Sequence, residues 1–144
     1  MFFDTNVLVR SRFEAAPGNA VARHWMKETS DSGETLRISR QIVREYLATV
    51  TRPQAWSPAV PMESALAQVA ELEAKFEILE DGPRVAERLV MLCREVPLVG
   101  RQIHDANIVA TMLAHGERRL LTFNAADFRR YGERIEMVDM GMPV

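Results

Sequence analysis

Short apolar runs alternate with longer helical patterns along this chain, and that alternation constrains its fold more than any other feature. Strand-like runs fall at residues 2–3, 35–38, 76–79, 119–123 and 135–138. Helical patterns occupy residues 6–15, 19–28, 40–51, 62–74, 84–95 and 102–114. Strands that alternate with helices predict an α/β fold, in which a parallel sheet is covered by helices on both faces. Because no linker, repeat or low-complexity tract divides the chain, we expect a single domain over residues 1–144.

Composition narrows the class of protein. The chain is 47% hydrophobic, which is ordinary for a globular protein. No apolar run approaches the roughly 20 residues that span a bilayer, and no basic segment precedes the first apolar stretch as in a signal peptide. We therefore expect a cytoplasmic protein without membrane contact. The net charge of −2 gives no overall basic field for nucleic acid, although sixteen arginines outnumber two lysines and arginine suits phosphate.

Cys93 is the only cysteine, which excludes an intrachain disulfide and a zinc knuckle. It lies among Leu89, Val90, Met91 and Leu92. We therefore expect Cys93 to be a small buried apolar side chain rather than a nucleophile.

Three aspartates stand next to strongly apolar segments. Asp4 ends the first apolar run, Asp105 lies inside the apolar stretch 102–114, and Asp127 follows the run 120–123. An ionised carboxylate beside buried apolar surface is unfavourable unless a partner compensates its charge. Asp4 and the turn that contains Asp127 both follow predicted strands, and parallel sheets place function at the carboxyl ends of strands. Such oxygen ligands suit Mg²⁺ or Mn²⁺.

Each aspartate also has a purely structural interpretation. Asp4 or Thr5 could cap the helix that follows the first strand. Asp105 could pair with Arg101 one turn earlier, or interact with the helix dipole. These interpretations explain one acid at a time. They do not explain why Asp4 and Asp127 both follow strands of one sheet.

Four segments together resemble the PIN-domain family, and more narrowly its VapC-type toxin ribonucleases. They are Phe3-Asp4-Thr5-Asn6, the helix around Glu45, His104-Asp105-Ala106-Asn107-Ile108-Val109-Ala110 and Thr122-Phe123-Asn124-Ala125-Ala126-Asp127-Phe128. The resemblance covers essentially the whole chain, in motif order and spacing. It implies a compact three-layer α/β/α domain with a mostly parallel central sheet and an acidic, metal-binding cleft.

The resemblance also implies which residues form that cleft. It maps the family's first three acids onto Asp4, Glu45 and Asp105, and Glu45 rests on the resemblance alone. At the fourth position Asn124 stands where many members have aspartate, and Asp127 is the nearest acid. We expect the carboxylates to be the catalytic and metal-binding groups: Asp4, Glu45, Asp105 and Asp127. We expect the polar neighbours to orient them or to contact substrate: Thr5, Asn6, Thr122 and Asn124.

The implied function is a metal-dependent endoribonuclease that serves as the toxin of a VapBC-type toxin–antitoxin pair. One or two Mg²⁺ or Mn²⁺ ions would activate water, and cleavage would leave a 5′-phosphate and a 3′-hydroxyl. Expected partners are the RNA substrate, a VapB-like antitoxin and a second copy of the chain in a homodimer. The candidate RNA-contacting arginines are Arg10, Arg12, Arg129 and Arg130. The candidate partner-facing apolar residues, some of which must also fill the core, are Leu66, Val69, Leu72, Leu89 and Leu92.

Three other functions fit an acidic pocket at strand ends. A haloacid-dehalogenase-type phosphatase would need a second aspartate two residues after Asp4, where Asn6 stands. A phosphorylation receiver would need a lysine after a late strand, and the lysines, Lys27 and Lys75, lie elsewhere. A non-catalytic PIN-like module that binds RNA or protein stays open, because Asn124 replaces an acid of the family's pattern.

Overall fold

The computed structural model describes residues 1–141, and its centre is a five-stranded parallel sheet. The strands stand in the order β3-β2-β1-β4-β5, and every neighbouring pair is parallel. Their bounds are β1 (Phe2–Phe3), β2 (Arg37–Ser39), β3 (Glu77–Leu79), β4 (Arg119–Leu121) and β5 (Glu136–Met137). The predicted α/β fold with its parallel sheet is confirmed.

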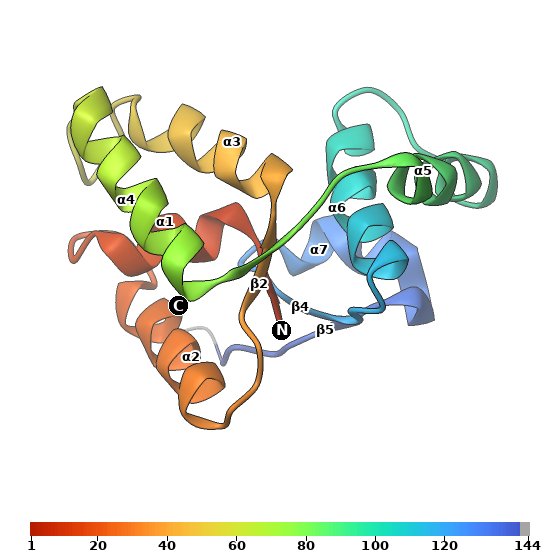
Figure 1. Ribbon diagram of the computed structural model, residues 1–144, viewed down its shortest axis with the longest axis horizontal. Coiled ribbons are helices and arrows are strands. Elements are labelled where there is room, and N and C mark those ends of the chain that lie inside the picture. Colours follow the sequence, from red (N-terminus) through yellow and green to blue (C-terminus); the bar gives the residue numbers. More distant parts are fainter. Residues whose placement is uncertain (142–144) are drawn as a thin grey trace.

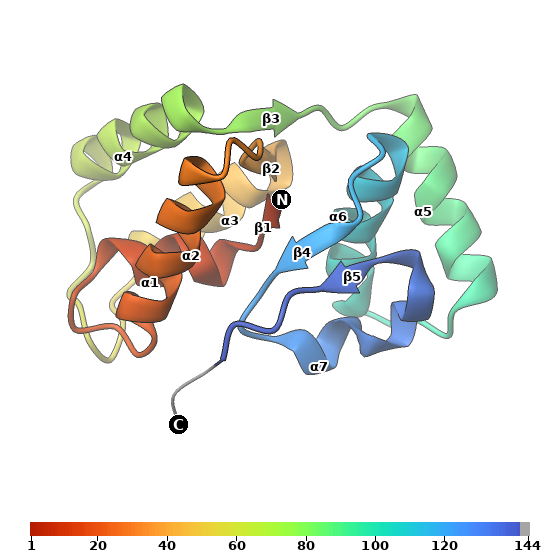
Figure 2. The ribbon, with the colours of Figure 1, turned by 90° about the horizontal axis from the view of Figure 1, so that it is seen from below.

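Helices cover both faces of this sheet. They are α1 (Thr5–Arg12), α2 (Asn19–Asp31), α3 (Arg40–Val50), α4 (Met62–Lys75), α5 (Pro83–Glu95), α6 (Gln102–Ala114), the short α7 (Ala125–Phe128) and a 3₁₀ segment (Arg129–Arg134). α1 to α4 lie on one side of the sheet, and α5 and α6 lie on the other (Figure 1, Figure 2). The chain moves outward from β1 to β3 and then crosses back to β4. Because such crossovers are right-handed, this reversal places the two groups of helices on opposite faces, which confirms the predicted three layers.

Local sequence explains where the helices that carry the predicted acids begin and what they bury. Ser39 caps α3 as predicted, with its hydroxyl accepting from the Ile42 N–H. α6 is apolar around most of its circumference, and Ala106, Val109 and Ala110 are fully buried. Among residues 1–141, every helix is too short or too polar to span a lipid bilayer.

Strand residues form the centre of the hydrophobic core. Phe2 and Phe3 of β1 and Leu120 and Leu121 of β4 are completely buried, as expected for strands covered on both faces. Phe3 meets Phe76 edge to face, with ring centroids 5.2 Å apart. This packing fixes the ends of the two central strands, and the first predicted acid follows directly after β1.

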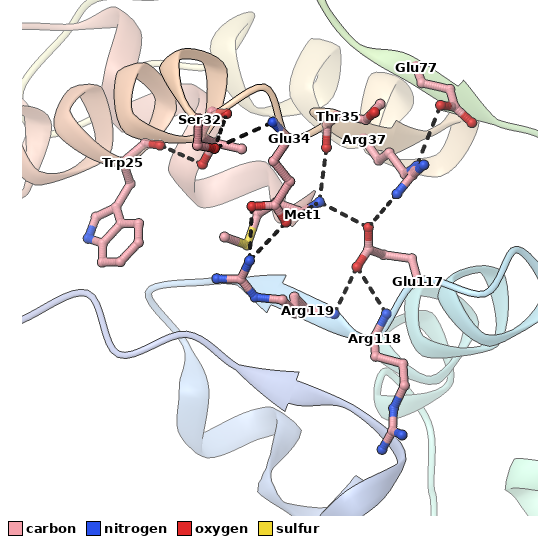
Figure 3. A network of polar contacts seen from close by, with 11 residues as sticks. Met1, Trp25, Ser32, Glu34, Thr35, Arg37, Glu77, Glu117, Arg118 and Arg119 are labelled. Carbon is pink, nitrogen blue, oxygen red and sulfur yellow. Dashed lines mark hydrogen bonds and ion pairs between the residues drawn. The ribbon is translucent and has the colours of Figure 1, made fainter.

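A network of charges closes the amino-terminal edge of the sheet (Figure 3). The Met1 ammonium donates to the Thr35 carbonyl and to Glu117 Oε2, each at 2.9 Å. Glu117 also accepts from the Arg37 guanidinium and from the Arg119 N–H, both at 2.9 Å. Burial opposes ionisation of Glu117, yet these donors outweigh it and lower its pKa. The network ties β1, β2 and β4 together at the edge opposite to the predicted acids.

One expectation about exposure is wrong, and a second is confirmed only for Leu66. Cys93 is exposed on α5, because this helix is amphipathic and turns that side to solvent. Of the residues expected to face a partner, Val69, Leu72 and Leu92 are buried in the core and Leu89 is partly buried. These residues lie on the inward faces of α4 and α5. The large apolar side chains that the two helices do expose are Met62, Leu66, Val90 and Met91.

Candidate functional site

The carboxyl ends of β1 and β4 bring two predicted site residues together. Phe3 pairs with Leu121 in parallel register, and the Asp4 N–H donates to the Leu121 carbonyl at 3.0 Å. Asp4 and Thr122 are the next residues of the two strands, and the Thr122 hydroxyl donates to Asp4 Oδ2 at 2.7 Å. Thr122 is itself buried, so it orients Asp4 from the interior.

Asp4 is a buried carboxylate held by several donors. It caps α1, where its Oδ1 accepts from the Thr5 N–H at 2.8 Å. Only 7% of the residue is exposed. Burial raises the pKa of Asp4 to about 6; the hydrogen bonds from Thr122 and Thr5 oppose this rise, and two nearby carboxylates add to it. Asp4 therefore does cap α1, but its ionised form is unfavourable in this buried position. A bound cation would stabilise the ionised form.

Asn6 joins Asp4 to the turn that follows β4. Its Nδ2 lies 3.4 Å from both Asp4 Oδ2 and Thr122 Oγ1, and its Oδ1 accepts from the Phe123 N–H at 3.1 Å. The Asn124 N–H in turn donates to Thr122 Oγ1 at 3.0 Å. The turn is thus fixed against the first residues of α1.

Glu45 enters the site from α3. The Thr5 hydroxyl donates to its Oε2 at 2.7 Å, and Gln41 Nε2 donates to its Oε1 at 2.9 Å. The helical wheel alone places Glu45 in solvent, but the residue is only partly exposed. Thr5, the residue after Asp4, and Gln41, on α3 itself, therefore hold one oxygen each of the Glu45 carboxylate.

Asp105 comes from α6 and Asp127 from α7. Burial raises the pKa of Asp105, the charges of Asp127 and then Glu45 raise it further, and Arg130 opposes the rise. Within the described part of the chain Asp105 forms no ion pair. The alternative in which Arg101 compensates Asp105 is therefore not observed.

These side chains line one cleft of about 550 Å³ at the carboxyl edge of the sheet. Its walls include the predicted site residues other than Thr122: Asp4, Thr5, Asn6, Glu45, Asp105, Asn124 and Asp127. An adjoining hollow of about 390 Å³ shares Asp105 and Asp127 with it. A larger hollow of about 770 Å³ lies between α1, α2 and α4, and it contains none of the predicted site residues.

The arginines expected to contact RNA fall into two groups. Arg10 lines the cleft, and Arg130 lines the adjoining hollow. Arg12 instead pairs with Glu71 at 2.7 Å in the larger hollow between α1, α2 and α4. Arg129 lines neither the cleft nor the hollow that adjoins it.

Sequence reasoning missed several residues of the cleft. Arg52 and Arg101 line it, and so does Trp56, whose ring packs against Phe13 with centroids 5.3 Å apart. Arg52 and Trp56 lie outside the periodic segments, so no local pattern links them to the acids, and helical spacing linked Arg101 only to Asp105. Gln41 lies outside the cleft lining; its position a helical turn before Glu45 made it, with Arg44, a candidate partner of that glutamate, and the structure shows the hydrogen bond to Gln41.

The carboxylate oxygens of the cleft suit a hard divalent cation, although they do not form a complete coordination shell. Among residues 1–141, no three His, Cys, Asp or Glu side chains stand close enough together to hold one metal ion. Mg²⁺ usually keeps several waters and is bound by one or two carboxylates together with substrate phosphates. The pKa values of Asp4 and Asp105 are raised because burial and neighbouring carboxylates disfavour their ionised forms, and a bound cation would stabilise those forms. The arrangement therefore fits an ion held by one or two carboxylates and completed by water and substrate.

The sequence and the structure both resemble known proteins. A family model described as PIN domain matches residues 1–134, which confirms the resemblance predicted from four short segments. No curated protein matches the sequence.

Solved structures share the fold over nearly the whole chain. VapBC2 from Rickettsia felis, bound to a promoter DNA fragment, has a TM-score of 0.71 and 18% identity, covering 96% of this chain and 98% of that chain. A toxin–antitoxin complex from Klebsiella pneumoniae has a TM-score of 0.67 and 23% identity, covering 99% and 98%. VapC20 from Mycobacterium tuberculosis, a sarcin-ricin loop cleaving toxin, has a TM-score of 0.67 and 16% identity, covering 92% and 95%. At these identities the likeness establishes a common fold and no more.

Proposed function

Since this chain belongs to the PIN-domain family, we propose that it is a metal-dependent endoribonuclease and the toxin of a VapBC-type toxin–antitoxin pair. One observation carries the proposal: carboxylates from four separate parts of the chain line one cleft. They are Asp4, Glu45, Asp105 and Asp127. Stability alone does not favour such a gathering, because like charges disfavour one another's ionised form. A divalent cation bound by some of these carboxylates would compensate their charge and could assist hydrolysis of a phosphodiester.

In this reaction the residues of the cleft would bind the ion and contact the substrate. A bound Mg²⁺ or Mn²⁺ would supply an activated water and neutralise charge on the scissile phosphate. Asp4, oriented by the Thr122 hydroxyl, and Asp105 would hold the ion directly, and Glu45 and Asp127, which line the same cleft, would reach it through its bound waters. Asn124 would offer a neutral polar contact where the family's pattern has an acid.

The rim of the cleft supports an RNA substrate. Arg10, Arg52 and Arg101 line the same cleft as the acids and can pair with backbone phosphates. Trp56 adds an aromatic face on which an unpaired base can stack. We therefore propose single-stranded or looped RNA as the substrate and the cytoplasm as the place of action.

Cleavage of a labelled single-stranded RNA of mixed sequence tests the proposal. The purified chain should cleave it with Mn²⁺ or Mg²⁺, leave 5′-phosphate ends and stop when EDTA is added. Asp4→Asn should slow cleavage about a hundredfold or more, because it weakens the hold on an ion that contributes several kcal/mol to catalysis. Glu73→Gln, an exposed carboxylate on α4 outside the cleft, is the matched control and should leave the rate unchanged.

The same assay can contradict the enzyme. If the wild-type chain binds RNA but cleaves it with neither ion, it is a non-catalytic PIN-like RNA-binding module. Asn124, which is exposed at the cleft in place of an acid, is the residue that favours this alternative.

We also propose a VapB-like antitoxin and a homodimer as the assemblies of this chain. Two of the similar structures are toxin–antitoxin complexes. An arginine of the partner that entered the cleft would neutralise the carboxylates through a two-pronged contact. The exposed apolar side chains of α4 and α5 offer surface to a second copy.

Co-expression with the product of a neighbouring gene tests these assemblies. The complex should protect cells and lack ribonuclease activity until the partner is removed, and the isolated chain should sediment as a dimer. A chain that is monomeric, harmless when expressed alone and bound by no neighbouring product contradicts this proposal.

A further inference from the structure

A buried glutamine connects Glu45 to the helix layer on the opposite face of the sheet. Gln41 lies on α3 one turn before Glu45 and is only 6% exposed. Its Nε2 donates to Glu45 Oε1 at 2.9 Å and to the His104 carbonyl on α6 at 2.8 Å. Its Oε1 accepts from Asn107 Nδ2, also on α6, at 2.9 Å. Both N–H donors and the carbonyl oxygen of this amide are therefore occupied.

Asn107 determines which way the Gln41 amide points. Its Nδ2 donates to Gln41 and also to Asp81 Oδ2, at 3.2 Å. Because a donor at this position requires an oxygen from Gln41, the Gln41 nitrogen must face Glu45. The reverse orientation would set two oxygens against each other at Glu45. The hydrogen bonds thus have one direction, and that direction supplies a donor to the carboxylate.

The Gln41 contacts join the helix layers on the two sides of the sheet. α3 lies on one side of the sheet and α6 on the other (Figure 1). The α6 partners of Gln41 flank Asp105, since His104 precedes it and Asn107 follows two residues later. The amide therefore ties the Glu45 carboxylate to the turn of α6 that carries Asp105.

Joining two helices does not by itself require this arrangement. Apolar packing would connect α3 and α6 without removing an amide from water. What the amide adds is control of a flexible side chain. Gln41 holds Glu45 Oε1 while the Thr5 hydroxyl holds Oε2, so Glu45 loses most of its rotamer freedom at the cleft. Groups that fix the orientation of a metal ligand in this way commonly determine its affinity.

We propose that Gln41 is a positioning residue, which holds the Glu45 carboxylate at a set separation from Asp105 and so determines the affinity of the cleft for a divalent cation. This inference rests on the proposed function, because it assigns both carboxylates to cation binding. Gln41 itself touches neither ion nor substrate in this scheme.

Titration of the purified full-length chain with Mn²⁺, followed by calorimetry, measures that affinity without RNA. Gln41→Met keeps the volume of the side chain and removes its hydrogen bonds. It should raise the Mn²⁺ dissociation constant about 10- to 100-fold. Cleavage should fall at low Mn²⁺ and recover at saturating Mn²⁺, a split that general loss of structure does not produce. Tyr46→Phe is the matched control, because it removes a partly buried hydrogen bond from the same helix, to Gln68 at 2.7 Å, without touching Glu45.

Asn107→Asp provides a second test if Gln41→Met fails to fold. It replaces the donor by an acceptor, so the Gln41 amide is drawn to turn its oxygen toward Glu45, and Mn²⁺ affinity should again fall. Unchanged Mn²⁺ affinity in the folded variant, or an equal loss in Tyr46→Phe, overturns the positioning role. A wild-type chain that binds Mn²⁺ but cleaves no RNA contradicts the ribonuclease and leaves the Mn²⁺ comparison valid. A wild-type chain that binds no Mn²⁺ contradicts both.

Discussion

Asp4 and Glu117 are buried carboxylates at opposite edges of the sheet, and their surroundings move their pKa in opposite directions. Burial raises the pKa of Asp4 to about 6. Burial acts in the same sense on Glu117, but its N–H donors, the Met1 ammonium and Arg37 outweigh it and lower the pKa. The two residues therefore make opposite contributions to the pH dependence of stability.

The folded pKa of Asp4 lies above its unfolded value of 3.8, so its contribution to stability is full below that pH and is lost as the pH rises through about 6. We predict that Asp4→Asn, without metal, is more stable than the wild type at about pH 7, by up to ~3 kcal/mol. The amide carries no charge and keeps an oxygen for the Thr5 N–H. Urea unfolding in EDTA measures the difference, which should nearly vanish at about pH 4. A variant less stable than the wild type at neutral pH would mean that the charge of Asp4 supports the fold.

Glu117 has a folded pKa below its unfolded value, so its stabilisation is present above that unfolded value and is lost as the pH falls through the folded one. We predict that Glu117→Gln lowers the free energy of unfolding at neutral pH by about 2 kcal/mol, because the buried Met1 ammonium loses one of its two carboxylate partners and keeps only Glu34. The loss should shrink in acid. Glu95→Gln, which breaks the exposed pair with Arg134, is the control and should change stability by less than about 1 kcal/mol. Equal losses would argue against a special role for the buried network.

The start of α2 packs closely against the turn that follows β4 and against an arginine of α1. Gly18 precedes α2 in the left-handed region, with φ of 79°, and a Cβ there would lie 2.9 Å from the Phe123 ring. The Arg10 guanidinium lies 4.5 Å from the centroid of the same ring. The start of α2 therefore supports both the turn after β4 and an arginine at the rim of the cleft.

Gly33 offers a matched comparison, because it has the same φ of 79° and no atom within 4 Å of an added Cβ. We predict that Gly33→Ala lowers stability by about 1–2 kcal/mol, the cost of the left-handed backbone alone. Gly18→Ala should lower it by about 1–3 kcal/mol more, because the Phe123 ring must move. Thermal unfolding of the two variants gives the comparison. Similar losses of stability in the two variants would show that the Phe123 ring moves aside at little energetic cost.

Elements with strong local signals could be predicted from the sequence. The stretch 102–114 is apolar on nearly every side, and it forms α6 over those residues. Ser39 marks the start of α3 through its hydroxyl. Asp4 was predictable as a site residue for the same kind of reason, since a charge directly after a buried strand needs a partner.

Features that depend on tertiary packing could not be predicted in this way. α7 and the 3₁₀ segment that follows are too short to show a helical period. Periodicity in α5 did not reveal which face packs inward, so Cys93 was misplaced. Gln41 looks like any polar helix residue, because its partners His104 and Asn107 come from the other layer. Glu45 needed the family resemblance, since its donors lie on other parts of the chain or on its own polar face.

Across the whole molecule, charge is distributed unevenly. The net charge is only −2, yet the acids gather inside one cleft and arginines stand around it. Local fields of this kind govern binding more than the total charge does. A chain with an acidic isoelectric point can therefore attract a cation and a phosphodiester backbone at adjacent places.

The dependence of RNA binding on salt tests this distribution. Each phosphate contact on a single strand adds about 0.7 to the slope of log affinity against log salt, so one contact from each of Arg10, Arg52 and Arg101 predicts a slope of about −2. Arg101→Ala should weaken binding and bring the slope to about −1.4, because one contact is lost. Arg12→Ala should change neither quantity, since that guanidinium pairs with Glu71 in a different hollow. Fluorescence anisotropy of a labelled RNA in EDTA, over a series of potassium chloride concentrations, measures both slopes. If Arg12→Ala lowers the slope as much as Arg101→Ala does, the RNA backbone does not follow the rim of the acidic cleft.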